Sequence, residues 1–253
     1  MAFHPNIPEV WESDWANKGN YSEVRGLWDA IDEIKFRYLR EKISKNGFAL
    51  EVGCGTARLL YFLANFGWQT VGFDFSPSAL ELARSRFVSK SLEIDLISGN
   101  AFNLPFRNRS FDLVSSTGLL EHFENPRSIV REMIRVLKPG GVFYSDIVPK
   151  KFSLLRSLDR FQINPLNNQK IIFERSFTRV EIIEMFEGLE IRDLCVVPAG
   201  IFLPRKFFPK ILTFANRFEY TISKYFGMLT TIFDGTSVAE LLGFYFIVLG
   251  TKI

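Results

Sequence analysis

The sequence contains little of what metal centres and disulfide frameworks are built from. Its 253 residues include only two cysteines, Cys54 and Cys195, and two histidines, His4 and His122. The cysteines have no C-x-x-C spacing, and such sparse cysteine is typical of a protein kept in a reducing compartment. We therefore expect no cysteine-based metal site. Chemistry that needs a histidine falls to His122, because His4 lies in the N-terminal tail.

Long apolar runs and a strong charge imbalance are also absent. The formal net charge is +3, which is too small to indicate nucleic-acid binding. The apolar stretch LLGFYFIVLG (241–250) has about half the length that a bilayer-spanning helix requires. The N-terminal stretch MAFHPNIPEVWESDW is polar and acidic, whereas a signal peptide is basic and then apolar. We therefore expect a cytoplasmic protein that is not integral to a membrane.

Strands and helices alternate through the first 150 residues. Apolar runs predict strands that end at residue 52 or cover 68–75, 92–101, 110–118 and 138–148. Apolar residues at helical spacing predict helices at 25–45, from residue 59, and at 76–87 and 125–137. This alternation predicts an α/β fold with a doubly wound, mostly parallel sheet and helices on both faces.

Local signals indicate where these elements begin. Ser76 is expected to cap a helix whose first residue is Pro77. Asn125 is expected in the same way to cap a helix that begins at Pro126. The segment KPGG (138–141) predicts a sharp turn into the fifth strand.

The second half of the chain is less regular. Thr178 and Glu181 form the pattern of a capping box, which predicts a helix over 176–186. Strands are predicted at 189–197 and 243–253, which completes a seven-stranded sheet. Between them, residues 198–240 form a long insertion rich in phenylalanine, lysine and arginine. We expect this insertion to be mostly helical, because it is too long for an ordinary connection.

A glycine turn joins the first strand to the next helix. In FALEVGCGTARLLYFLA (48–64), a buried strand ends at Val52, and Gly53 and Gly55 precede a helix. A strand, a glycine turn and a helix together bring backbone N–H groups against a ligand at the helix N-terminus. The sequence therefore predicts a ligand site at this turn.

Two kinds of ligand could bind at the turn. A nicotinamide dinucleotide favours G-x-G-x-x-G, and here Arg58 stands where the third glycine would be. Asp74, at the end of the second strand, suits either ligand because both present a ribose there. Glu51 would repel a pyrophosphate and attract a cationic group. A positively charged, nucleoside-like ligand without phosphate is therefore favoured.

Five segments stand in the order found in class I S-adenosylmethionine-dependent methyltransferases: LEVGCGTA, VGFDFSPSALELAR, GNAFNLPFRNRSFDLV, GLLEHF and REMIRVLKPGGVFYSDI. The chain resembles most closely the small-molecule group that includes the menaquinone and ubiquinone methyltransferases. The resemblance covers about residues 25–150 and weakens beyond about residue 197.

The resemblance implies S-adenosylmethionine as cofactor and a set of residues that bind it. Gly53 and Gly55 would let the backbone approach the methionine part, and Glu51 would lie near its amino group. Asp74 would accept hydrogen bonds from the ribose hydroxyls, and Phe75 would lie against the adenine. The other implied cofactor-binding residues are Cys54, Asn100, Ala101, Phe102 and Thr117.

Two positions depart from the family's pattern. Asn100 stands where relatives usually carry aspartate at the adenine edge, and its amide oxygen can still accept one hydrogen bond. Ala57 stands where glycine is common, and we expect its methyl group to be tolerated.

Each of these residues also has a plainer explanation. The glycine turn could be a tight connection without a ligand, and Asp74 could act only on the dipole of the following helix. Cys54 suits a small turn filler better than a nucleophile, and Phe75 could belong to the core.

His122 is the candidate catalytic base, because it follows the fourth strand at the edge where ligands collect. A base is needed only for a poor nucleophile such as a hydroxyl or a carbon acid. Relatives often carry a histidine here as part of the fold, so a structural role remains the alternative. The ubiquinone O-methyltransferase branch has an acidic metal-binding residue where this chain has Gly118. Glu121 and His122 alone make a poor Mg²⁺ site, so we expect no metal.

The remaining segments suggest how the acceptor is held. Residues 202–234 carry seven phenylalanines and five basic residues against two acidic ones. The helices expected there could form an apolar lid, rest on a membrane surface or mediate a homodimer. Trp11, Trp15 and Tyr21 are expected to help close the site.

We expect a single domain over 1–253. Its parts are a helical N-terminal lid (1–45), the cofactor-binding core (46–150), the rest of the sheet (151–197 and 241–253) and a helical substrate or lid insertion (198–240).

The sequence thus predicts a methyltransferase that acts on a small, apolar or amphipathic acceptor, such as a lipid, quinone or isoprenoid. A non-catalytic binding module is the main alternative, and an NAD-dependent oxidoreductase is disfavoured. A nucleic-acid methyltransferase is also disfavoured, because the fourth strand ends in SSTG rather than in a D/N-P-P-Y pattern.

Overall fold

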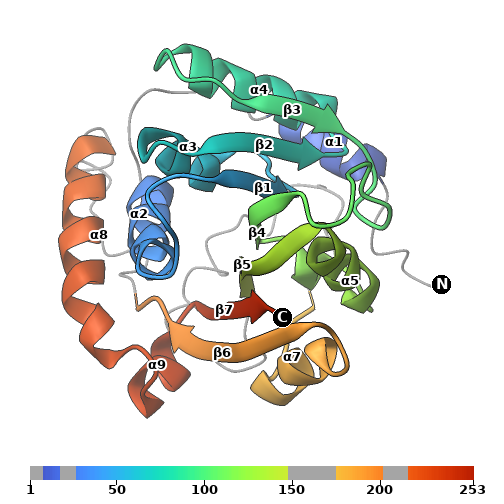
Figure 1. Cartoon of the computed structure of the whole chain (residues 1–253). Coiled ribbons are helices and arrows are strands. Elements are labelled where there is room, and N and C mark those ends of the chain that lie inside the picture. Colours follow the sequence, from blue (N-terminus) through green and yellow to red (C-terminus); the bar gives the residue numbers. More distant parts are fainter. Residues whose placement is uncertain (1–7, 18–26, 148–174, 202–215) are drawn as a thin grey trace.

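A seven-stranded sheet runs through the molecule, with helices on both faces (Figure 1). The computed structural model describes residues 8–17, 27–147, 175–201 and 216–253. The strand order is β3-β2-β1-β4-β5-β7-β6, and the described strands all run in one direction except β7, which is antiparallel to β5 and β6. The strands are β1 (Phe48–Val52), β2 (Gln69–Asp74), β3 (Asp95–Ser98), β4 (Phe111–Thr117), β5 (Leu137–Ile147), β6 (Ile191–Ala199) and β7 (Tyr245–Lys252). The predicted α/β fold, with its mostly parallel seven-stranded sheet, is confirmed.

Two hydrophobic layers hold helices against the sheet. One layer joins it to α2 (Leu27–Arg40), α3 (Arg58–Asn65) and α4 (Pro77–Val88). The other joins it to α5 (Arg127–Val136) and α7 (Arg179–Phe186) on the opposite face (Figure 1). In α5 the buried side chains are Ile129, Val130, Met133, Ile134 and Val136. This is the spacing that gives a helix one apolar face.

Most of the predicted helix starts agree with the structure. Ser76 caps α4 and accepts a hydrogen bond of 3.1 Å from the Ala79 amide, and Pro77 is the first helical residue. The capping box of Thr178 and Glu181 is also present.

The predicted start of α5 was wrong by one residue. The helix begins at Arg127, with Pro126 at the N-cap, one residue later than expected. The Asn125 side chain still accepts a hydrogen bond of 3.2 Å from the Arg127 amide, so it caps the helix from one position further out.

The Pro-Gly-Gly segment was expected to be a turn before the fifth strand, and this was wrong. It lies inside β5, where the pairing with β4 jumps from Phe111–Leu137 to Leu113–Val142. Gly140 has a φ of +75°, a conformation open to glycine at little cost. The extra residues form an irregular bulge, so the strand starts earlier than its apolar run does.

The described part of the insertion packs against α2, beside the sheet (Figure 1). It contains α8 (Asn216–Thr230), a short 3-10 turn (Thr231–Phe233) and α9 (Ser237–Leu242). Lys224 forms an ion pair of 2.5 Å with Glu33, and Tyr38 donates a hydrogen bond to Asp234. The expectation that the insertion is mostly helical agrees with these residues; 202–215 lie outside the described ranges.

Candidate active site

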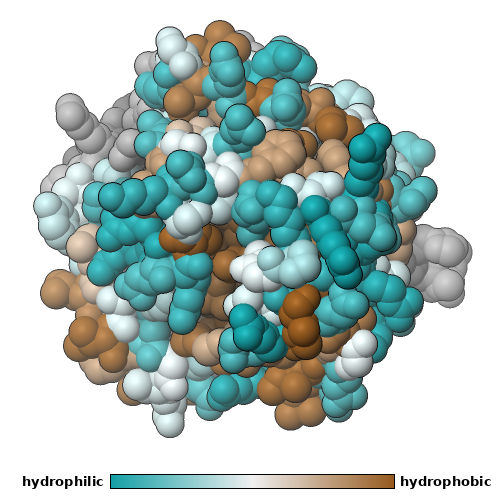
Figure 2. Space-filling model, viewed as in Figure 1, coloured by the Kyte–Doolittle hydropathy of each residue, from teal (hydrophilic) through white to brown (hydrophobic). Residues whose placement is uncertain are grey.

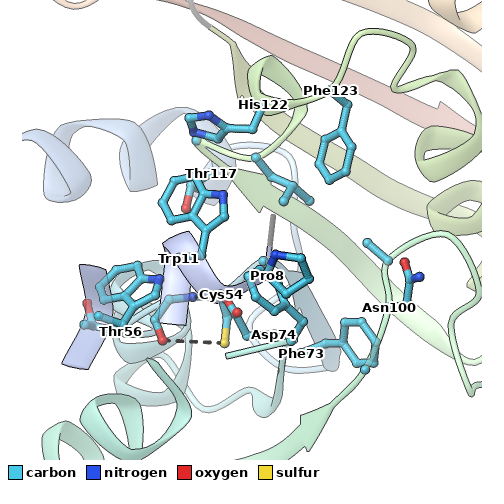
Figure 3. A pocket seen from close by; sticks show the side chains of 18 of the residues that line it. Pro8, Trp11, Cys54, Thr56, Phe73, Asp74, Asn100, Thr117, His122 and Phe123 are labelled. Atoms are coloured by element: carbon cyan, nitrogen blue, oxygen red, sulfur yellow. Dashed lines mark hydrogen bonds between the residues drawn. The ribbon is translucent and has the colours of Figure 1, made fainter. Parts of the chain in front are cut away.

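A pocket of about 530 Å³ opens at the carboxyl ends of the parallel strands, where the glycine turn also lies (Figure 3). The helix α1 (Pro8–Ala16) forms part of its wall. All predicted site residues except Glu51 line this pocket: Gly53, Cys54, Gly55, Asp74, Phe75, Asn100, Ala101, Phe102, Thr117 and His122. The sequence therefore identified residues that the fold brings together.

The glycine turn needs both of its glycines. Gly53 and Gly55 have φ values of +67° and +51°, where residues with a Cβ are strained. A Cβ on Gly53 would lie 2.7 Å from Leu119, and one on Gly55 would lie 2.9 Å from Trp15. The turn is tied to β2, because the Gly53 amide donates a 2.8 Å hydrogen bond to the Phe73 carbonyl. Both glycines line the pocket, and the absence of a Cβ lets Leu119 and Trp15 pack against the turn.

Asp74 organises the neighbouring turn. Its carboxylate accepts hydrogen bonds of 2.9 Å from the Gly55 amide and 3.0 Å from the Ser76 amide. Burial raises the pKa of Asp74, and these two amides oppose that rise. Each carboxylate oxygen still has a lone pair to offer. Asp74 can therefore accept hydrogen bonds from a ligand while holding the turn.

Glu51 does not line the pocket. Its side chain is fully buried, and Oε1 accepts a 2.7 Å hydrogen bond from the Thr117 hydroxyl, which does line the pocket. Oε2 has no hydrogen-bond partner among the described residues. Burial raises the pKa of Glu51 to about 8. Burial therefore favours the neutral form of this carboxyl group, which lies behind Thr117.

Three charged residues, Asp32, Arg58 and Asp146, interact with Glu51, and Lys35 pairs with two of them. Arg58 and Lys35 both form ion pairs with Asp32. Lys35 also lies 3.0 Å from Asp146, which accepts a hydrogen bond from the Gly118 amide. Two cations thus face two carboxylates besides Glu51. An ionised Glu51 would leave this buried cluster with an excess negative charge.

Aromatic side chains line much of the rest of the pocket. Phe102 and Phe123 contact each other edge to face, with ring centroids 5.2 Å apart. Phe75 is 38% exposed and lies on the pocket wall, so it is not a core residue. Asn100 accepts a 3.0 Å hydrogen bond from the Phe102 amide, which fixes the turn after β3.

His122 ends a short 3-10 turn (Leu120–His122) that follows β4. Its ring lies 4.7 Å from the ring of Trp11 in a T-shaped contact (Figure 3). Trp11 and Trp15, both on α1, line the pocket as the sequence suggested; Tyr21 lies outside the described residues. Helix α1 thus reaches the candidate base.

Cys54 is a filler of the turn. It is 5% exposed and packs in the core cluster beside α3. Burial raises the pKa of its thiol well above the ordinary value. The thiolate needed for nucleophilic attack is therefore scarce at neutral pH.

Sequence reasoning missed several pocket residues. Leu119 and Phe123 line the pocket and flank His122 in the segment GLLEHF, so their closeness to the candidate base was the available signal. Nothing in the sequence around Pro8 and Thr56 indicated that they would line the pocket. Ala57 has a φ of +51°, which explains why glycine suits this position.

Three further observations concern the described residues. None of the described residues in 198–240 lines the pocket, so in the described residues only α1 supplies a covering helix. Within those same residues, no group of three or more metal-binding side chains comes together. No described helix has the length and apolar character that crossing a bilayer demands.

Comparisons with known proteins agree with this architecture. A family model described as Methyltransferase domain matches residues 50–145. The chain is 26% identical over 140 residues to a ubiquinone biosynthesis O-methyltransferase of Coxiella burnetii, covering 55% of this chain and 58% of that protein. It is 31% identical over 130 residues to the Xanthomonas oryzae pv. oryzae protein of the same name, covering 49% and 54%. The chain thus spans little more than half the length of these curated relatives.

Solved structures extend the likeness to most of the fold. A SAM-dependent methyltransferase from Methanosarcina mazei has a TM-score of 0.59 at 19% identity, covering 85% of this chain and 97% of that one. A possible histamine N-methyltransferase from Thermotoga maritima has a TM-score of 0.55 at 19% identity, covering 90% and 100%. At these identities the likeness establishes the fold.

Proposed function

We propose that this chain is an S-adenosylmethionine-dependent methyltransferase of class I and that it methylates a small apolar or amphipathic acceptor. The observation that carries the proposal is the two-sided pocket. One side is glycine backbone beside a buried carboxylate, and the other side is aromatic. A polar nucleoside suits the first side, and an apolar acceptor suits the second.

The residues present fit the cofactor of this family. Gly53 and Gly55 line the pocket, and a Cβ at either would meet Leu119 or Trp15. Only glycine therefore fits this turn, and we propose that the methionine part lies against its backbone. Asp74 offers lone pairs to ribose hydroxyls, and Phe75 offers an exposed ring face for the adenine. S-adenosylmethionine would supply a methyl group bonded to a positively charged sulfur. A nucleophile would bond to the methyl carbon, and the sulfur would leave as the neutral thioether of S-adenosylhomocysteine.

The acceptor is proposed to lie between Trp11, Leu119 and Phe123, on the side of the pocket near His122. Aromatic and aliphatic walls favour an apolar or planar molecule over a polar one. The main contribution of such a site is to align the nucleophile with the methyl group. We propose that His122 accepts the proton of a hydroxyl acceptor as the new bond forms.

Calorimetry with S-adenosylhomocysteine and with NAD tests the cofactor. We expect binding of the first and none of the second. Binding of NAD alone, or of neither, would overturn the proposal.

A panel of quinols, isoprenoids and fatty acids, assayed by release of S-adenosylhomocysteine, tests the acceptor. Turnover of an apolar member is expected. Ligand binding without turnover across this panel would favour the non-catalytic binding module instead.

We also propose that catalysis needs no metal. Activity is expected to persist in excess chelator, because Glu121 and His122 alone offer too few oxygen ligands for Mg²⁺. Activity that chelation abolishes and Mg²⁺ restores would contradict this.

We further propose that the protein works in the cytoplasm and contacts a membrane surface through residues 202–233. In the described part, exposed apolar side chains extend from α8 into the following turn, and Figure 2 shows apolar atoms over that end of α8. They are Tyr225, Met228, Leu229, Ile232 and Phe233. Basic residues outnumber acidic ones over 202–234, which favours an anionic surface.

Co-sedimentation with anionic vesicles at low salt tests this contact. We expect the protein to bind the vesicles, and we expect Leu229→Ser and Ile232→Ser to weaken this binding. A dimer in light scattering without vesicle binding would mean that this face joins two copies instead.

A further inference from the structure

Helix α1 covers the pocket but is weakly held by apolar packing. None of its residues is buried. Its main neighbour is α4. Elements with few buried apolar contacts open at low free-energy cost. Polar contacts must therefore account for much of what keeps α1 in place.

Glu12 makes those contacts at the N-terminus of α4. Its carboxylate accepts hydrogen bonds from the hydroxyls of Ser76 and Ser78, and a longer one of 3.4 Å from the Ser78 amide. These bonds, led by the one from Ser76, lower the pKa of Glu12. A carboxylate at a helix N-terminus is also favoured by the helix dipole.

The same helix turn carries both tryptophans of the pocket. Trp11 precedes Glu12 and contacts His122, and Trp15 follows three residues later and covers Gly55. Of the two serines that Glu12 contacts, Ser76 also contacts the proposed ribose-binding residue, because its amide donates a hydrogen bond to Asp74. A single carboxylate therefore fixes α1 relative to both halves of the site.

We infer that Glu12 is a positioning residue that fastens α1 over the pocket, so that releasing this contact frees the cofactor product. This inference rests on the proposed function for its ligand. The contact itself concerns only α1 and α4. Glu12 touches neither reactant; it acts through Trp11, Trp15 and Ser76.

Glu12→Ala tests the inference, with Glu9→Ala as the matched control. Glu9 is an exposed glutamate on the same helix. Stopped-flow tryptophan fluorescence gives the dissociation rate of S-adenosylhomocysteine. We expect Glu12→Ala to raise it about tenfold or more, because the variant loses the hydrogen bonds that a charged carboxylate makes to α4, and Glu9→Ala to leave it unchanged. Glu12→Gln, which keeps an acceptor oxygen, is expected to fall between.

Hydrogen exchange of residues 8–16 in the ligand-free protein supplies the second readout. Glu12→Ala is expected to speed exchange there relative to Glu9→Ala, while β1 and β4 stay unchanged. Equal exchange and equal release rates in the two variants would overturn the inference. Faster exchange in a protein that binds no S-adenosylhomocysteine would keep the fastening role and overturn the proposed function and the ligand-release part of the inference.

A double-mutant cycle identifies the partner. Because Ser78 donates to Glu12, Glu12→Ala and Ser78→Ala should have non-additive effects on the exchange of α1. Additive effects would mean that Glu12 does not act through this contact.

Discussion

The two sides of the pocket are built in different ways. The proposed cofactor side consists of Gly53, Gly55 and Asp74, which lie at the ends of β1 and β2. There the Gly55 amide donates to the Asp74 carboxylate and the Gly53 amide donates to the carbonyl before Asp74. The acceptor side consists of Trp11, His122 and Phe123, which come from α1 and from the segment after β4. The first side is fixed by the sheet, and the second depends on a helix that packs on the surface. Substitutions of Asp74 and His122 should therefore separate ligand affinity from turnover, whereas loosening α1 should affect both.

The largest effect is expected from Asp74→Ala. This change removes the carboxylate that holds the Gly55 and Ser76 amides. It also removes the proposed partner of the ribose. Affinity for S-adenosylhomocysteine should fall at least about 100-fold, because lost hydrogen bonds to a charged group cost about 1.5–3 kcal/mol each. Calorimetry measures the affinity, and circular dichroism checks the fold.

Asp74→Asn serves as the control, since it keeps one acceptor oxygen and should lose less. If both variants bind as tightly as the parent, the cofactor side does not depend on this carboxylate.

His122→Ala is expected to lower turnover by about 10² to 10⁴, the usual contribution of a general base. Affinity for S-adenosylhomocysteine should stay unchanged, because the cofactor side does not include this ring. Steady-state kinetics and calorimetry give the two values. Unchanged turnover would show that His122 is not the base. A loss of affinity as large as the loss of turnover would show that His122 also contributes to cofactor binding.

Glu51→Gln should change how stability depends on pH. The pKa of Glu51 is about 8 in the folded protein and 4.5 ordinarily. The folded protein therefore keeps a proton that the unfolded chain releases between these values. The contribution of this proton to the free energy of unfolding is fully present below pH 4.5. It decreases by about 1.4 kcal/mol per pH unit above pH 4.5 and is lost as the pH rises through 8. Denaturant unfolding from pH 6 to pH 8 should show a shallower slope in the variant.

The same carboxyl group links cofactor affinity to pH. A cationic ligand favours ionised Glu51, so the affinity for S-adenosylmethionine should rise with pH up to about 8. The groups that face Glu51 are Thr117, Asp32, Arg58 and Asp146. Glu51→Gln should bind with a weaker pH dependence; an unchanged profile would assign the effect to another group.

The smallest effect is expected from Ala57→Gly. The left-handed conformation costs an L-residue about 1–2 kcal/mol, but a buried methyl group contributes about 0.8 kcal/mol. We expect a gain in stability of no more than about 1 kcal/mol, measured by urea unfolding. Ala64→Gly, within α3, is the control and should lose stability. Equal losses at both positions would mean that the strain at Ala57 is not released.

The sheet and the cofactor side could be predicted because their signals are local. Gly53, Gly55 and Asp74 stand at fixed distances from strands with continuous apolar runs, and parallel strand ends meet at one edge. The role of Glu12 could not be predicted, because its contact with Ser76 joins residues far apart in the chain. The burial of Glu51 behind Thr117 depends likewise on the pairing of β1 with β4. The bulge in β5 was missed because a Pro-Gly-Gly segment is more often a turn.

The position of β7 has a consequence for how the molecule assembles. This strand is the last in chain order, yet it lies between β5 and β6. Until it inserts, β6 has no neighbour in the sheet, and the edge of β5 stays open to pairing with other chains. Deleting residues 245–253 should therefore yield an aggregating product rather than a slightly smaller enzyme. During synthesis, the sheet can close only after β7 has emerged from the ribosome.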